Sequence, residues 1–114
     1  MPDFFYSTVF TANLQDNRPL ANWQFRRLPY PARVTILQRS TTLGNRTSIF
    51  SGSTNIVQRS PVQGGGTAGV TPSPLNTPVV QFDGQQGDEI IISNDEVLAG
   101  TPTLDGWVNV EPLI

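Results

Sequence analysis

The sequence contains no cysteine, no histidine and no lysine among its 114 residues. Without cysteine, disulfide bridges, thiolate nucleophiles and cysteine-bound metals are excluded. Without histidine or lysine, a serine or threonine nucleophile lacks its usual activating base. The three glycines at 64–66 are not followed by the Gly-Lys-Ser/Thr of a phosphate-binding loop. The sequence therefore predicts a protein that is not an enzyme and that holds no cofactor.

Charged residues are scarce, at 14% of the chain, against about 25% in an average soluble domain. No apolar run approaches the ~20 residues of a membrane-spanning helix. The first residues lack the basic segment and the cleavage site of a signal peptide. We therefore expect no membrane partner and no targeting signal. Serine, threonine, asparagine and glutamine are abundant instead, and a surface of such neutral polar groups suits extensive subunit contacts.

The charges that are present are distributed unevenly along the chain. Seven arginines and only two aspartates lie within the first 59 positions, which gives this part a net charge of +5. From Ser60 onward there are seven acidic residues and no basic one, which gives −7. Arginine presents a planar fork of donors that pairs with carboxylates in two-point contacts. The two parts are therefore suited to pair, either within one subunit or between neighbouring subunits.

Long helix-favouring segments are also lacking, because ten glycines and ten prolines are spread along the chain. Short runs alternate instead between apolar and polar residues, with the two-residue period of half-buried strands. Turn-forming residues separate eight such runs, which predicts an all-β fold, either an antiparallel sandwich or a small jelly-roll-like domain. The predicted strands are Phe4–Phe10, Trp23–Leu28, Arg33–Arg39, Thr47–Phe50, Thr54–Arg59, Val79–Phe82, Glu89–Ser93 and Trp107–Val110.

Individual residues refine this prediction. The run Ile90–Ile92 does not alternate, which is typical of a strand buried on both faces at the centre of a sheet. The dipeptides Asp83-Gly84 and Asp105-Gly106 favour tight turns, and Gly52 can supply the positive φ of a strand reversal. We expect one domain with two regions. Residues 1–31 contain an extended N-terminal arm or edge strand, and residues 32–114 form the sandwich body.

Two segments are candidates for contacting a partner. The stretch 64–78 is rich in glycine, proline, serine and threonine and predicts a long extended connection. The segment before the body interleaves aromatic side chains with fixed positive charge, a mixture that can stack on bases and pair with phosphates. The net charge of −2 and the absence of lysine favour an acidic protein surface over nucleic acid as its partner. The predicted contact residues are Trp23, Arg26, Arg27, Tyr30 and Arg33.

Three other sites remain open from the sequence. Asp83, Asp88 and Glu89 surround a glycine-containing loop and offer the oxygen ligands that calcium prefers, although their spacing differs from an EF-hand. Trp23 and Trp107 could form a stacking surface for sugars in a carbohydrate-binding sandwich. Paired carboxylates for glycoside hydrolysis are present among Asp88, Glu89, Asp95 and Glu96.

The second half of the chain resembles a known group of proteins. The stretch from Arg59–Val62 through the Gly/Thr/Pro connection to Val79–Gly84 and Gly87–Ser93 is similar to the small β-rich decoration, or cement, proteins of bacteriophage capsids. The closing Gly106–Leu113 is similar to the final strand of such domains.

The resemblance implies a structural virion protein that is made in the host cytoplasm. It would bind the major capsid protein on the outside of the phage head, commonly as a trimer, and stabilise the shell. The alternative is a ligand-binding β-sandwich, either a carbohydrate-binding module or an accessory domain of the tail or baseplate.

Overall fold

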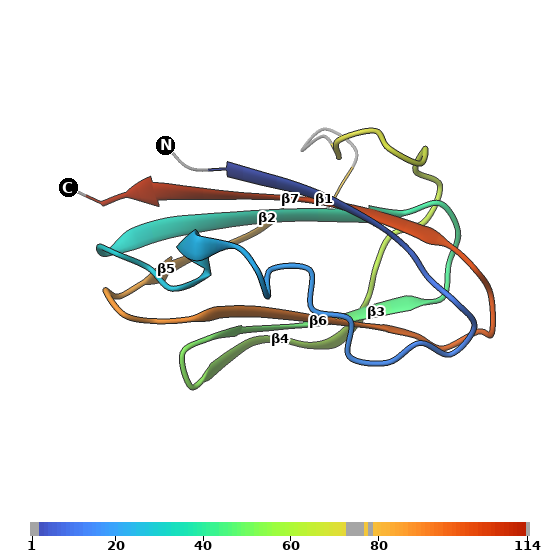
Figure 1. The fold of residues 1–114 in the computed structure, drawn as a ribbon, viewed down its shortest axis with the longest axis horizontal. Coiled ribbons are helices and arrows are strands. Elements are labelled where there is room, and N and C mark those ends of the chain that lie inside the picture. The colour runs from blue at the N-terminus through green and yellow to red at the C-terminus, as the bar shows by residue number, and fades with distance from the viewer. Residues whose placement is uncertain (1–2, 73–76, 78, 114) are drawn as a thin grey trace.

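The computed structural model describes residues 3–72, Thr77 and residues 79–113. Two antiparallel sheets pack face to face (Figure 1), one of four strands in the order β1-β7-β2-β5 and one of three in the order β4-β3-β6. This arrangement confirms the predicted β-sandwich. The elements are β1 (Asp3–Val9), a turn of 3-10 helix η1 (Gln24–Arg26), β2 (Ala32–Ser40), β3 (Asn45–Ser51), β4 (Thr54–Pro61), β5 (Val79–Gly84), β6 (Ile90–Glu96) and β7 (Thr103–Pro112).

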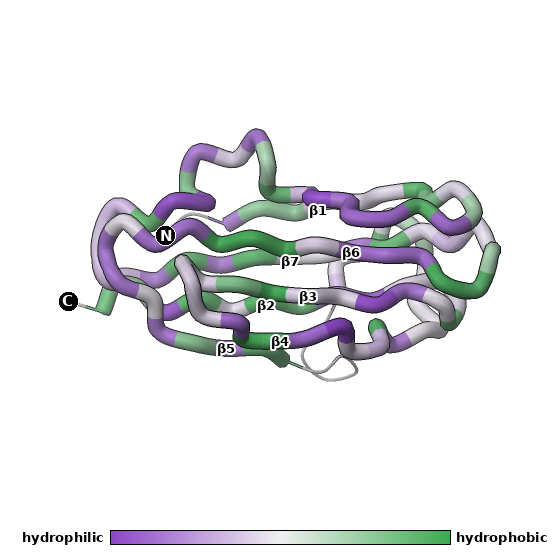
Figure 2. Tube along the Cα trace, turned by 90° about the horizontal axis from the view of Figure 1, so that it is seen from below, coloured by the Kyte–Doolittle hydropathy of each residue, from purple (hydrophilic) through white to green (hydrophobic). Residues whose placement is uncertain are grey.

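The strands of both sheets run along the long axis of the molecule, which measures 42 × 27 × 21 Å. Figure 2 shows that polar and apolar residues are interspersed along them. Seven of the eight predicted strands coincide with observed ones, but the prediction of a strand at Trp23–Leu28 is wrong. Trp23 and Leu28 are both buried in the same core. Their residue numbers differ by five, an odd number, so a straight strand would place their side chains on opposite faces. The turn η1 between them lets both side chains face inward.

The core lies between the sheets and also includes side chains from the described part of the segment 1–31. Val34 and Ile36 of β2 and Val108 and Val110 of β7 are at most 1% exposed, and each such side chain contributes about 1.5–3 kcal/mol when fully buried. Strand β1 is the edge of the four-stranded sheet. The first 31 residues supply further core side chains, namely Tyr6, Phe10, Leu20, Trp23 and Leu28. The described part of the N-terminal region is therefore packed into the sandwich.

The run Ile90–Ile92 is not in a central strand, which corrects the prediction from its lack of alternation. β6 pairs with β3 alone and is the last strand of its sheet. Ile90 and Ile92 face the core at 1% exposure, whereas Ile91 is half-buried on the opposite side. The other edge of β6 is covered by the segment 14–28, which forms one isolated bridge to Asn94 of β6 and a second to Glu89, directly before β6. Ile91 lines a pocket beneath this segment, which explains an apolar residue at that position.

The predicted turn at Asp105-Gly106 is also wrong, because both residues lie inside β7. Gly106 is directly opposite Tyr6 of β1, and a Cβ added at Gly106 would lie 2.0 Å from the Cζ of that ring. The glycine thus serves close packing rather than chain reversal. The reversal at Gly52 between β3 and β4 is confirmed, with φ of +59°. Asp83-Gly84 ends β5, and the turn that follows it contains Gly87, with φ of +90°.

Candidate interaction surface

The structure places the two aromatic members of the predicted contact segment largely inside the protein. Trp23 is 9% exposed, and its ring stacks on Phe4 of β1 with centroids 5.3 Å apart and an interplanar angle of 18°. The ring of Phe25 is tilted at 58° to that of Trp23, with centroids 5.9 Å apart. Tyr30 is half-buried against the same core. These rings hold the segment 14–28 on the sandwich and leave little aromatic surface for a partner.

The arginines of the predicted contact segment are already paired with carboxylates. Arg26 Nε lies 3.4 Å from Glu89 Oε2, and Arg27 Nη2 lies 3.1 Å from the other oxygen of the same carboxylate. Arg33 Nε lies 3.1 Å from Asp83 Oδ1, across the β2–β5 pair. The structure thus brings Arg26 and Arg27 together at Glu89 but places Arg33 at a different position on the sandwich.

The basic first part of the chain and its acidic second part pair with each other within one subunit. The described residues form five ion pairs, and four of them join an arginine of the first 59 residues to a carboxylate beyond Ser60. The shortest of these four joins Arg59 Nη1 to Asp95 Oδ2 at 2.7 Å. The two parts of the chain therefore meet within one subunit. The pairs of Arg26, Arg27 and Arg33 are at least one-third exposed on both sides, and pairs of this kind contribute only about 0–1 kcal/mol each.

The acidic residues considered for calcium do not converge. Asp83 pairs with Arg33, and Glu89 pairs with Arg26 and Arg27. Asp88 Oδ2 accepts a hydrogen bond from the Gln85 backbone N–H at 3.0 Å and closes the turn between β5 and β6. Within the described ranges, no three side chains of the metal-binding types come together.

Buried ionisable side chains hold the framework together. Burial raises the pKa of Tyr6 well above 10.0, and its hydroxyl donates to Gln38 Oε1 at 2.7 Å. Glu96 is fully buried, and the backbone N–H of Asn13 is the main reason that its pKa is lowered from 4.5. The Asp16 carboxyl is exposed, and its pKa is also lowered, first by a hydrogen bond from Ser93 and second by a hydrogen bond from Arg18.

The outer face of the four-stranded sheet carries a continuous line of apolar side chains. Phe5 lies opposite Trp107, Trp107 lies opposite Leu37, and Leu37 lies opposite Val79. Residues directly opposite each other on neighbouring strands point to the same face. We call these four residues the apolar row, to which each strand of the sheet contributes one. Leu37 is only 2% exposed, Trp107 is half-buried, and the two ends of the row are open, with Phe5 at 40% and Val79 at 48%.

Polar residues flank the apolar row on both sides. On one side, the residues two positions away from the row on each strand are Asp3, Asn109, Thr35 and Gln81. On the other side they are Ser7, Asp105 and Arg39. The Nε1–H of Trp107 donates to Asp3 Oδ2 at 3.3 Å, which orients the indole ring. The Gln81 amide donates to Thr35 Oγ1 at 3.1 Å. The face is therefore an apolar strip between two polar strips.

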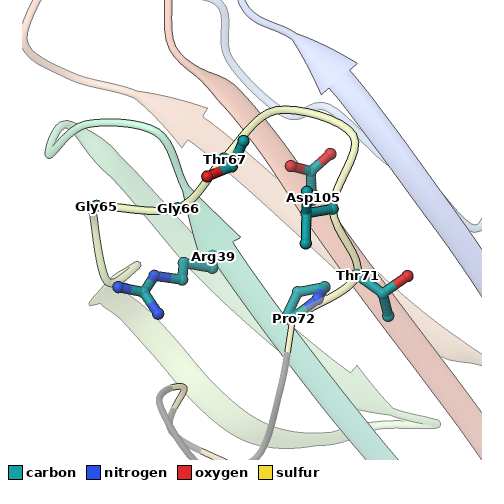
Figure 3. A pocket seen from close by; sticks show the side chains of 8 residues that line it. Arg39, Gly65, Gly66, Thr67, Thr71, Pro72 and Asp105 are labelled. Atoms are coloured by element: carbon teal, nitrogen blue, oxygen red, sulfur yellow. The ribbon is translucent and has the colours of Figure 1, made fainter.

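A glycine-rich loop bounds this face at one end. Its described part, residues 64–72, crosses over β2 and β7 beside Arg39 and Asp105 (Figure 3). The backbone N–H of Gly69 donates to both carboxylate oxygens of Asp105, at 3.2 and 3.1 Å, and Arg39 Nε donates to the carbonyl oxygen of Gly64 at 3.3 Å. A pocket of about 250 Å³ lies between loop and sheet, with Val70 at its rim. Residues 73–76 and 78 of the predicted contact 64–78 lie outside the described residues.

The apolar row is the feature that the sequence did not reveal. The two-residue period of a strand puts Leu37 on the same face as Arg33 and Arg39, and Trp107 on the same face as Asn109. Only the register between strands shows that the apolar members of four separate runs align. In the described part of the chain, no helix is long and apolar enough to cross a membrane. No family model, curated protein or solved structure matches this chain.

Proposed function

We propose that this protein is a structural virion protein that decorates the outside of a phage head and stabilises the shell. In this proposal the outer face of the four-stranded sheet binds the major capsid protein. The observation that supports it is the apolar row, which reaches from one edge of the sheet to the other and is open at Phe5 and Val79.

An apolar strip with polar borders has the composition of a protein–protein interface. The exposed apolar surface of the row lies at Phe5, Val79 and part of Trp107, because Leu37 is 2% exposed. Exposed apolar surface on a soluble protein marks an interaction site, and aromatic side chains in such a site supply much of the binding energy. The flanking amides and hydroxyls of Asn109, Thr35 and Gln81 provide hydrogen bonds at the rim. Arg26 and Arg27 are secondary contacts in this proposal, because Glu89 already neutralises part of their charge.

Substitution at the two open ends of the apolar row tests the proposal. Phe5→Ser combined with Val79→Ser is expected to weaken binding to shells of the major capsid protein from the same source by about tenfold or more, because two apolar anchors are lost. Leu43→Ser with Leu98→Ser is the matched control, since these side chains are 69% and 66% exposed but lie in loops away from the row. Binding is measured by co-sedimentation at equal protein concentration.

The melting temperature of each variant shows whether the fold is retained. Equal binding by the row variant and the wild type would contradict docking through this face. Loss of binding by the loop variant alone would place the contact elsewhere.

A second candidate function is carbohydrate binding, and one observation favours it. Trp107 and Phe5 lie opposite each other on the outer sheet face beside Asp3 and Asn109, an arrangement of aromatic rings and polar groups that suits stacking on a sugar. This candidate predicts retention on a polysaccharide resin that Trp107→Ala abolishes, whereas substitution of the buried Trp23 would act only through stability. Absence of retention on a broad glycan array would rule it out.

A further inference from the structure

The sheet edges differ in how well they are protected from pairing with another chain. The edge of β6 is covered by the segment 14–28. The edge strand β4 is irregular, because its pairing with β3 shifts register twice and Arg59 has a positive φ of 42°. β5 carries the charged Asp83 and ends in glycine. Covers, bulges and charges are the means by which proteins block free edges. β1 carries a charge only at its first residue, Asp3, and from Phe4 to Val9 it contains no charge, proline or glycine.

Hydrogen bonds at the end of β7 show which way the backbone groups of β1 point. The carbonyl oxygen of Pro102 accepts from Phe10 N–H at 2.8 Å, so even-numbered residues of β7 face β1. The carbonyl oxygen of Thr103 accepts from Thr41 N–H at 3.0 Å, so odd-numbered residues face β2. The register pairs even residues of β1 with even residues of β7. Even residues of β1 are therefore the ones that bond to β7, and its odd residues face the free edge.

Asp3, Phe5, Ser7 and Val9 accordingly direct their N–H and C=O groups away from the sheet. All four residues are exposed, Val9 to 72%. Within the part of the chain that the structure describes, nothing pairs with this edge. An extended strand docking here would meet donors and acceptors at two-residue spacing, next to the open end of the apolar row.

We propose that β1 pairs with β1 of a second copy of this chain, antiparallel and across a two-fold axis. The two four-stranded sheets would then form one continuous sheet of eight strands. When all residues of β1 are paired, Phe5 faces Ser7 of the partner subunit, and Asp3 faces Val9 of the partner subunit. The odd residues of both strands then bond to each other, which uses every free backbone group of this edge.

Charge and shape favour a second copy as the occupant. The antiparallel arrangement places the two Asp3 carboxylates at opposite ends of the strand pair, about 20 Å apart at 3.4 Å per residue. Phe5 and Phe5 of the partner subunit become diagonal neighbours, roughly 7–8 Å apart and within reach of aromatic contact. The apolar rows of both subunits thus join at their open ends. This inference goes beyond the proposed function and holds whatever surface the outer face binds.

Ser7→Pro tests the pairing directly. Proline has no N–H, and the N–H of Ser7 faces the free edge, so the substitution removes a bond to the partner while the bonds between β1 and β7 remain. Light scattering after size exclusion should give twice the chain mass of 12.4 kDa for the wild type and a single chain mass for Ser7→Pro. Ser7→Ala is the matched control, because it removes the hydroxyl but keeps the N–H, and it should remain dimeric.

Amide hydrogen exchange of the wild type provides a readout that does not depend on the variant folding. The amides of Phe5, Ser7 and Val9 should become protected as protein concentration rises, whereas those of Tyr6 and Thr8 should be protected at all concentrations. A monomeric wild type, a dimeric Ser7→Pro variant or amides that exchange fast at every concentration would overturn the inference. So would the trimer that the resemblance implies. Shell binding by a monomer would leave the proposed function intact and remove only the strand pairing.

Discussion

Gly106→Ala is expected to lower the free energy of unfolding by about 3 kcal/mol, at the upper end of the usual cost of overpacking a core. The added Cβ would lie 2.0 Å from Cζ and 2.3 Å from both Cε2 and the hydroxyl oxygen of Tyr6. Neither residue can move easily, because they lie directly opposite each other on paired strands. The ring must therefore leave its position, and urea denaturation followed by circular dichroism would measure the loss.

Displacing Tyr6 also breaks a buried polar network that joins the two sheets. The hydroxyl of Tyr6 donates to Gln38 Oε1 of β2 at 2.7 Å. Gln38 in turn donates to Thr47 of β3 at 2.9 Å and accepts from Asn94 of β6 at 3.0 Å. Such networks are costly when only part of them is satisfied. The expected fall in melting temperature is roughly 10 °C or more, from about 4 °C per kcal/mol for a domain of this size.

Two further variants show whether the ring is the cause. Gly100→Ala is the matched control, since its Cβ would meet nothing closer than 3.8 Å and the residue has no positive φ. It should change stability little. Tyr6→Ala removes the obstacle, so Tyr6→Ala with Gly106→Ala should cost much less than the sum of the two single changes. Additive effects would mean that Gly106 is required for a reason other than the ring.

Glu96→Gln is expected to lower stability strongly at pH 7 and to remove part of its dependence on acid pH. Glu96 is fully buried at the end of β6. Its Oε1 accepts from Asn13 N–H at 2.9 Å and its Oε2 from Leu98 N–H at 2.9 Å. The carboxylate thus ties the turn after β1 to the turn after β6. Glutamine keeps one acceptor but turns an NH₂ group toward a backbone donor, which leaves buried groups unsatisfied.

The direction of the pH effect follows from the lowered pKa of Glu96. A group whose pKa is lower in the folded state stabilises the fold above its unfolded pKa and loses this contribution as pH falls through the folded pKa. The difference in urea midpoint between wild type and Glu96→Gln should therefore be largest at pH 7. It should shrink below about pH 4.5, the ordinary pKa of this carboxyl. Asp16 acts in the same direction, so the comparison with Glu96→Gln isolates the contribution of Glu96.

Glu111→Gln serves as the control for this experiment, because Glu111 is exposed near the end of β7. It should leave both the midpoint at pH 7 and its acid dependence unchanged. A gap between wild type and Glu96→Gln that stays constant from pH 7 to pH 3 would show that the carboxylate charge is not what holds the two turns.

The local part of the fold was readable from the chain alone. Alternation and turn residues predicted seven of the strands, because a half-buried strand imposes a two-residue period that no other element shares. The same patterns wrongly placed the strand of Ile90–Ile92 at the centre of a sheet and wrongly placed Gly106 in a turn. In both cases the reason is a neighbour distant in sequence, the segment 14–28 over β6 and the Tyr6 ring over β7. Local patterns report that a position is apolar or small but not which residue packs against it.

By itself the sequence determined three properties of this protein. It excluded chemistry that needs cysteine, histidine or lysine, it specified an all-β sandwich, and it showed that the arginines and the later carboxylates are suited to pair. Only the tertiary structure decided that this pairing occurs within the subunit, as at Arg33–Asp83 and Arg59–Asp95. It also decided that Phe5, Trp107, Leu37 and Val79 form one row. The reason is strand register, which depends on contacts between residues up to about a hundred positions apart and leaves no local trace in the sequence.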